Sequence, residues 1–301
     1  MTRLTIALGK YGVTRALHDG AVRVDGVDLD FVQVEPITAG MRRMVRTLDF
    51  DICEMAFTTY LCAKALGAPI IALPVFVTRN FHQWAAFRTA NGPVKTPKDL
   101  EGKTVAVNRG YTVTTGLWVR GVLQDEYGVD LDRVTWMATD EEHVATYRAP
   151  KNANYQGRGK TPAELMLSGT CAAAIGDVKT DSPDIQPLIA NARDAGFAWF
   201  RKTGIYPINH GVVVKTALLK EMPDLAQRLT KAFTAAKAAY RLAEDDTPQG
   251  KTARVNAPVV GDPFPFGIAP NRKALEAIVR YSVEQHVIPT AFRVEDLFAP
   301  V

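Results

Sequence analysis

The sequence predicts an α/β protein of two lobes with a ligand cleft between them. Strand-like and helix-like segments alternate through residues 4–67, a spacing that indicates parallel strands connected by helices. The alternation restarts after the polar stretch 79–84, where we expect the chain to cross from the first lobe to the second. A second crossing at 204–214 returns the chain to the first lobe. We therefore expect a discontinuous lobe I, made of residues 1–84 and 208–301, and a lobe II of residues 85–207.

Each element of lobe I follows from a local pattern. Residues 27–34 alternate apolar and polar side chains, which is typical of a half-exposed strand, whereas residues 51–56 are largely apolar and indicate a buried strand. Gly9 and Gly67 mark the end of a strand and of a helix. In chain order, the expected elements are strand 4–8, strand 27–34, helix 37–47, strand 51–56, helix 61–66 and strand 70–77.

The rest of the chain continues the alternation. Pro97 and Pro162 each follow a threonine and stand at the first position of an expected helix. Residues 148–162 form a polar excursion, which is either a mobile loop over the cleft or a surface insertion. The other expected elements are strands at 85–88, 104–107, 134–137 and 171–175, a strand pair at 204–214, and helices that end at Tyr127 and span 161–167, 224–243 and 272–286.

Composition excludes several classes of protein. Of the 301 residues, 47% are hydrophobic and 23% are charged, which is the ordinary balance of a globular chain. The net charge of +4 comes from scattered basic residues, so we expect no nucleic-acid surface. Three cysteines without a CxxC pair, no leader-like N-terminus and no apolar run of about 20 residues predict a cytoplasmic protein without a membrane segment.

The motifs of several common enzyme classes are missing from the sequence. It contains no GxSxG, no P-loop and no GxGxxG, which weighs against hydrolases, nucleoside triphosphatases and dinucleotide enzymes. Ligands of open α/β sheets bind outside the carboxyl ends of the strands. The loops at these ends and the first crossing supply the candidate site residues Arg15, Glu54, Thr58, Tyr60, Arg79, His82, Trp84, Arg109, Thr112, Thr114, Thr115, Asp177 and His210.

The segment 109–115 predicts an anion site. A helix that begins there offers free backbone N–H groups and the positive end of its dipole, and the threonine hydroxyls add donors. Arg109 can bind a carboxylate through two parallel hydrogen bonds. The alternative is an ordinary N-cap threonine beside a solvated arginine. Arg15 and Arg79 could bind a second carboxylate or line the same pocket.

Two histidines and one glutamate are the candidates for acid–base chemistry. His82 and His210 lie at the two predicted crossings, where they could exchange protons near neutral pH. Glu54 interrupts an apolar strand, so its carboxylate must be paired or have a raised pKa. Together the three could instead bind a divalent metal, although no HxH or HExxH spacing supports this. The alternative for each histidine is a hydrogen-bonded structural residue.

Several segments resemble the 4,5-dihydroxyphthalate decarboxylase family, which is itself similar to type II periplasmic binding proteins. The resemblance extends along nearly the whole chain. The matching segments are 51–55 with Tyr60 and Leu61, 74–76 with Arg79 and Phe81, 118–129, 204–210, 265–268 and 271–276. It implies an α/β, two-lobed, type II periplasmic-binding-protein-like fold.

The sequence departs from the family pattern in the predicted pocket. The first loop of the family tends to read Gly-Asp-Tyr-Asp, but here residues 9–12 read Gly-Lys-Tyr-Gly, followed by the retained Thr14 and Arg15. At the first crossing, His82 and Gln83 follow Phe81, where the family pattern has an arginine and then a histidine. These changes leave the fold unaffected and leave the exact substrate open.

The resemblance implies a non-oxidative decarboxylase of a hydroxylated aromatic acid, a lyase of aromatic-compound catabolism and phthalate degradation. In that function Arg15, Arg79 and Arg109 bind carboxylates, His82 and His210 share the proton transfers, and Glu54 orients one histidine. No cofactor is predicted beyond the metal alternative above. The expected partner is a small anionic aromatic substrate, with a homo-oligomer left open. The rival interpretation is a non-catalytic solute-binding protein for an aromatic or dicarboxylic acid.

Overall fold

The computed structural model describes all 301 residues, which divide into two compact units. Unit 1 contains Met1–Asn80, Ile208–Glu276 and Phe292–Val301, and unit 2 contains Phe81–Pro207 and Ala277–Ala291. The units differ from the predicted lobes in two respects. The first boundary lies four residues earlier, and residues 277–291 belong to unit 2 rather than to the N-terminal lobe. None of the helices is both long enough and apolar enough to cross a membrane.

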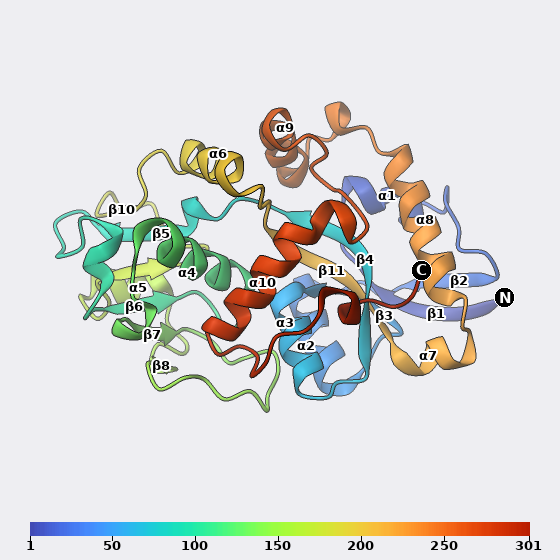
Figure 1. The fold of residues 1–301 in the computed structure, drawn as a ribbon, viewed down its shortest axis with the longest axis horizontal. Helices are drawn as coiled ribbons and strands as arrows, with labels where there is room; N and C mark the ends of the chain where they lie inside the picture. Colours follow the sequence, from blue (N-terminus) through green and yellow to red (C-terminus); the bar gives the residue numbers. More distant parts are fainter. The chain divides into compact units, whose positions relative to one another are not determined.

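Unit 1 is built on a five-stranded mixed sheet in the order β2-β1-β3-β11-β4 (Figure 1). Its strands are β1 (Thr2–Ala7), β2 (Val27–Phe31), β3 (Ile52–Ala56), β4 (Ile70–Arg79) and β11 (Ile208–Lys215). β1 pairs in parallel with β2 and β3, whereas β11 pairs antiparallel with both β3 and β4. The parallel pairing expected from the alternation of residues 4–67 is confirmed for β1, β2 and β3, and the returning chain adds β11 as an antiparallel strand between β3 and β4. The expected strand pair at 204–214 is a single strand.

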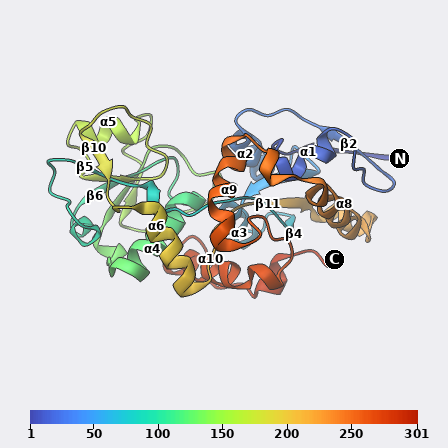
Figure 2. The same ribbon diagram turned by 90° about the horizontal axis from the view of Figure 1, so that it is seen from above.

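The helices of unit 1 are α1 (Arg15–His18), α2 (Ile37–Thr47), α3 (Phe57–Ala65), α7 (Thr216–Glu221), α8 (Leu225–Ala239) and α9 (Pro248–Val260). Short 3-10 turns occur at η1 (Gly12–Thr14), η5 (Leu242–Glu244), η6 (Ala269–Asn271) and η7 (Val294–Leu297). α8 packs against α1, as both views of the ribbon show (Figures 1 and 2). Apolar side chains of β1, β4, β11 and α8 form one buried cluster, which fixes the sheet edge where the loop after β1 begins.

Unit 2 contains a six-stranded mixed sheet in the order β10-β5-β9-β6-β7-β8. The strands are β5 (Ala86–Thr89), β6 (Thr104–Val107), β7 (Thr135–Ala138), β8 (Ala153–Asn154), β9 (Ala173–Ile175) and β10 (Ile185–Pro187). β6 to β9 are mutually parallel, and β5 runs antiparallel to both of its neighbours. Part of the polar excursion 148–162 is thus β8, an edge strand of this sheet.

The helices of unit 2 are α4 (Thr114–Tyr127), α5 (Pro162–Leu167) and α6 (Ala192–Thr203), with 3-10 turns η2 (Gln83–Ala85), η3 (Pro97–Leu100) and η4 (Leu131–Arg133). The last helix, α10 (Arg272–Glu284), begins in unit 1 and ends in unit 2. Its Tyr281 packs edge-on against Trp118 and donates a hydrogen bond of 2.5 Å to Asp125 Oδ2. The Tyr281 ring fills the space beside Gly121, where a Cβ would approach it to 2.4 Å. These contacts explain why residues 277–291 belong to unit 2.

Candidate active site

The centre of the candidate site is Glu54, whose side chain is completely buried in the middle of β3. Three groups donate hydrogen bonds to its carboxylate. The Gly9 backbone N–H donates to Oε2 at 2.9 Å, and the Tyr11 hydroxyl donates to Oε1 at 2.7 Å. The third partner is His210, whose Nδ1 lies 2.6 Å from Oε1. The structure thus brings two of the three predicted catalytic residues into direct contact, both within unit 1.

The strand register explains how Glu54 and His210 meet. In the antiparallel pair β3–β11, His210 stands opposite Ala56, two residues beyond Glu54. Side chains two residues apart on a strand share one face, so His210 and Glu54 are diagonal neighbours on that face. On the other side of β3, the strand β1 ends at Ala7 beside Cys53, which places the following loop over the carboxylate.

The hydrogen bonds indicate which proton each group carries. Burial raises the pKa of Tyr11, and the neighbouring carboxylate of Glu54 raises it further, so the phenol stays protonated and donates. The His210 side chain is 21% exposed, unlike the fully buried carboxylate. Because the Glu54 carboxylate can only accept a hydrogen bond, Nδ1 of His210 carries the ring proton and donates it. Nε2 of the same ring is left with a lone pair that can act as a base. The arrangement can therefore move a proton at Nε2 while Glu54 stabilises the charged imidazolium.

The loop after β1 is fixed by its own hydrogen bonds. Thr14 Oγ1 donates to the Gly9 carbonyl at 2.7 Å and accepts from the Tyr11 N–H at 2.9 Å. The Nε2 atom of His18 lies 3.3 Å from the same carbonyl. A Cβ at Gly9 would approach the Tyr11 ring to 2.4 Å, so a larger residue there would displace the ring that donates to Glu54. The sequence reasoning missed Tyr11 as a site residue, although the tyrosine of this loop is shared with the family pattern.

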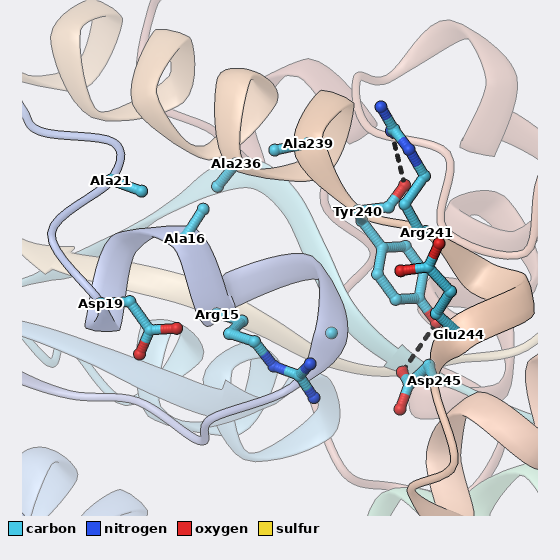
Figure 3. A pocket seen from close by; sticks show the side chains of 11 residues that line it. Arg15, Ala16, Asp19, Ala21, Ala236, Ala239, Tyr240, Arg241, Glu244 and Asp245 are labelled. Carbon is cyan, nitrogen blue, oxygen red and sulfur yellow. Dashed lines mark hydrogen bonds between the residues drawn. The ribbon is translucent and has the colours of Figure 1, made fainter.

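Arg15 and Arg79 belong to unit 1 but lie in different surroundings from Glu54. Arg15 is exposed and lines a pocket of about 230 Å³, where its side chain extends toward Asp245 (Figure 3). The Tyr240 hydroxyl donates to Asp245 in the same pocket at 2.8 Å. Arg79 ends β4, is 5% exposed and donates a hydrogen bond to Asn271 Oδ1.

Thr58 and Tyr60 lie in the buried part of α3, and their role in substrate binding stays a prediction. Both side chains are completely buried. The Tyr60 hydroxyl donates to the Leu297 carbonyl at 2.5 Å and so attaches the C-terminal segment to the core. The sequence places these residues directly after β3, but the helix turns their side chains inward.

The remaining candidates lie in unit 2. His82 precedes η2 and is only 2% exposed, whereas Trp84 within η2 is 38% exposed. Asp177 is exposed in the loop after β9, and its carbonyl accepts a hydrogen bond from Asn108 Nδ2 at 3.0 Å. Thr114 and Thr115 form the first turn of α4, the former buried and the latter half-buried. No group of three or more His, Cys, Asp or Glu side chains in the chain is arranged to hold a metal ion.

The predicted anion site before α4 is filled by a carboxylate of the protein itself. Glu142 accepts from the backbone N–H groups of Tyr111 at 2.5 Å and Thr112 at 3.1 Å, and from Thr112 Oγ1 at 2.5 Å. The Tyr155 hydroxyl adds a fourth donor at 2.8 Å. The hydroxyl and N–H of Thr112 both donate to Glu142 in this structure, and its role in substrate binding stays a prediction.

Comparison with solved structures defines the class of protein. The chain superimposes on the periplasmic aliphatic sulphonate-binding protein SsuA of Escherichia coli with a TM-score of 0.57, at 13% identity, covering 99% of this chain and 97% of the other. The desulfurization enzyme DSZB gives a TM-score of 0.58 at 14% identity, with 100% and 97% covered. The chain therefore has the periplasmic-binding-protein fold. A binding protein and an enzyme share this fold, so the fold alone does not decide the activity.

Sequence relatives narrow the assignment. The 4,5-dihydroxyphthalate decarboxylase of Comamonas testosteroni is 30% identical over 273 residues, which cover 86% of this chain and 81% of the relative. The enzyme of the same name from Pseudomonas putida is 29% identical over 211 residues, covering 66% and 81%. Residues 12–155 also match the family described as NMT1/THI5 like. The chain belongs to the 4,5-dihydroxyphthalate decarboxylase family.

Proposed function

We propose that this protein is a non-oxidative decarboxylase of a hydroxylated aromatic carboxylic acid similar to 4,5-dihydroxyphthalate. The observation that carries the proposal is the pair of Glu54 and His210, joined at 2.6 Å, with a buried carboxylate and a partly exposed imidazole. A carboxylate that is bound to one ring nitrogen fixes the tautomer of a histidine and makes its other nitrogen a better base. The relatives named as decarboxylases indicate the type of reaction in which this pair would transfer protons.

The chemistry needs one proton acceptor and one proton donor in succession. His210 Nε2 removes the proton of a ring hydroxyl para or ortho to the departing carboxylate, and the resulting phenolate pushes electron density to the ipso carbon. The imidazolium then protonates that carbon. The bond between the ring and the carboxylate breaks, its electron pair restores the aromatic phenolate, and CO2 leaves. The phenolate finally takes a proton from water, so the net change consumes one proton and releases one CO2.

The surroundings of Glu54 suit this cycle. The imidazolium formed midway is stabilised by a carboxylate at 2.6 Å in a buried setting, where charge interactions are stronger than in water. Gly9 and Tyr11 fix the carboxylate so that it need not reorganise when His210 changes charge. The roles of Arg15, Arg79 and Arg109 in carboxylate binding, of His82 in proton transfer, and the interlobe ligand cleft stay predictions, as does the cytoplasmic location.

The experiment that tests the proposal measures CO2 released from 4,5-dihydroxyphthalate and from a panel of hydroxybenzoates. We expect turnover of those acids that carry a hydroxyl para or ortho to a carboxylate, and none of phthalate itself, which has no phenol. The same panel is titrated calorimetrically. Tight binding without CO2 from any member would overturn the proposal in favour of a solute-binding protein, the alternative raised by the structural similarity to the sulphonate-binding protein.

A further inference from the structure

Glu142 is bound in unit 2 as a ligand carboxylate would be. Its side chain is 7% exposed, and four donors converge on its two oxygens. Two of the donors are consecutive backbone N–H groups, an arrangement that binds anions in many proteins. Gly110 completes the site, since a Cβ there would lie 2.6 Å from Glu142 Oε2. A larger residue at position 110 would therefore displace the carboxylate from its donors.

A buried arginine and the Glu142 carboxylate bind to the two ends of the same peptide group. Arg120 in α4 is completely buried, and its Nη2 donates to the Tyr111 carbonyl at 2.8 Å. That carbonyl belongs to the same peptide as the Thr112 N–H, which donates to Glu142. The guanidinium also lies 4.0 Å from the centre of the Tyr111 ring, and its Nε donates to Gln285 Oε1 at 2.7 Å. A cation and an anion thus act on opposite ends of one peptide and fix its orientation.

The same segment determines the backbone of Arg109. This residue has a φ of +68°, in the left-handed region that non-glycine residues rarely adopt. Its N–H donates to Thr139 Oγ1 at 2.8 Å, and its carbonyl accepts from the Thr139 N–H at 3.0 Å. Residues 139–142 therefore form hydrogen bonds with Arg109, Tyr111 and Thr112, and they hold Arg109 in a conformation that it would not adopt alone.

We propose that Glu142 is a positioning residue, a built-in carboxylate that fixes the loop from Arg109 to Thr112 and thereby directs the Arg109 side chain for substrate binding. The part concerning substrate rests on the proposed function above. The part concerning the loop does not, because it follows from the four donors and the cavity around the carboxylate. If the cavity is a carboxylate receptor, it will accept a small free carboxylate once the side chain of Glu142 is cut back.

The test compares Glu142→Ala with Glu142→Gln in the presence of formate or acetate. Removal of the carboxylate leaves buried N–H groups unpaired, so we expect KM for 4,5-dihydroxyphthalate to rise about tenfold or more in Glu142→Ala, with a much smaller change in kcat. Formate should restore KM, and sodium chloride at equal ionic strength should not. Glu142→Gln is the matched control, because its amide still fills the cavity and leaves no room for formate.

A melting experiment separates this inference from the proposed reaction. Formate should raise the Tm of Glu142→Ala, but not that of the wild type or of Glu142→Gln, whether or not the protein releases CO2. If Glu142→Ala folds only when formate is present, that recovery supports the inference equally. Failure of formate and acetate to change the Tm, the folding yield and KM of Glu142→Ala would overturn it. A loss confined to kcat, with KM unchanged, would overturn the positioning role.

Discussion

Each unit of the molecule contains a buried glutamate that is surrounded by donors, and the two differ in what those donors are. Glu54 in unit 1 binds one backbone N–H, one phenol and the imidazole of His210, which is 21% exposed. Glu142 in unit 2 binds two backbone N–H groups, a threonine hydroxyl and a phenol. Only the first carboxylate has an imidazole among its partners, and the other ring nitrogen of that imidazole can accept a proton.

This difference shows that burial of a carboxylate does not by itself identify a catalytic residue. Both glutamates have their hydrogen bonds satisfied, as buried charges must. Glu54 is hydrogen-bonded to the imidazole of His210, which is partly exposed, so Glu54 can affect a bound substrate through that ring. Glu142 binds backbone N–H groups, so it can affect a bound substrate only through the shape of the loop. The chemistry and exposure of the partners, rather than the carboxylate, separate the two functions.

The largest expected effect comes from replacing each glutamate by its neutral isostere. Glu54→Gln should lower kcat by about 10²- to 10⁴-fold, because the imidazolium of His210 loses its counter-charge and its tautomer is no longer fixed. Glu142→Gln should act mainly on KM. Steady-state CO2 release from 4,5-dihydroxyphthalate measures both constants. Equal losses of kcat in the two variants would remove the distinction between the two carboxylates.

The next effect concerns the tyrosine bound to each carboxylate. Tyr11→Phe removes one of the three donors to Glu54, and we expect kcat to fall about tenfold, as a charge-assisted hydrogen bond is lost. Tyr155→Phe removes the corresponding donor to Glu142 and is the matched control, with kcat nearly unchanged. If Tyr155→Phe lowers kcat as much as Tyr11→Phe does, the two sites are not functionally different in the way described.

A third effect is on stability alone. Gly110→Ala places a Cβ 2.6 Å from the Glu142 carboxylate, so we expect the free energy of unfolding to fall by about 1–3 kcal/mol. Gly40→Ala in α2 is the control, because its Cβ would meet its nearest neighbour at an ordinary 3.5 Å. Urea denaturation of the two variants measures the difference. An unchanged stability of Gly110→Ala would show that the loop yields easily and that Glu142 does not fix it.

The smallest expected effect is a pH dependence of stability from His18 beside the Glu54 site. Burial lowers the pKa of His18, and the charge of Lys10 lowers it further. The hydrogen bond that the ring donates to the Gly9 carbonyl raises the pKa and partly offsets these effects. The unfolded chain therefore binds this proton more readily than the folded chain, so stability rises with pH. The contribution is complete above the unfolded pKa of about 6.5 and is lost as pH falls toward the folded value.

Replacement of His18 by glutamine should reduce this acid sensitivity. We expect the loss of unfolding free energy between pH 7 and pH 5 to be smaller in His18→Gln than in the wild type, as measured by denaturant titration at both pH values. His286→Asn is the control, since His286 is exposed and asparagine tolerates its left-handed backbone at a φ of +58°. If His18→Gln loses as much unfolding free energy between pH 7 and pH 5 as the wild type does, His18 is not the source of the acid sensitivity.

Local pattern predicted much of the fold. The helix expected at 37–47 is α2, with the same bounds, and the strand expected at 104–107 is β6. The direction of β11 could not be predicted, because a strand pattern does not reveal whether a returning chain pairs parallel or antiparallel. α9 was missed because Pro248 and Pro258 make its sequence look like a loop, although proline is tolerated at the first turn.

The candidate site was predictable where one residue violated a local rule. Glu54 stood out as a carboxylate in an apolar strand, and His210 as a histidine at the start of another strand. Glu142 gave no such signal, since it lies 30 residues from Thr112 in a charged segment that resembles solvated surface. The donors before α4 were recognised from the sequence, but the anion that binds them is determined only by tertiary structure.

The central claim is that His210, supported by Glu54, performs the proton transfers of a decarboxylase. The most direct test measures CO2 release and substrate binding together in His210→Ala. We predict that calorimetry shows 4,5-dihydroxyphthalate bound within a few-fold of the wild-type affinity, while CO2 release falls by about 10²-fold or more. Unchanged turnover in His210→Ala would contradict the claim and remove His210 from the mechanism.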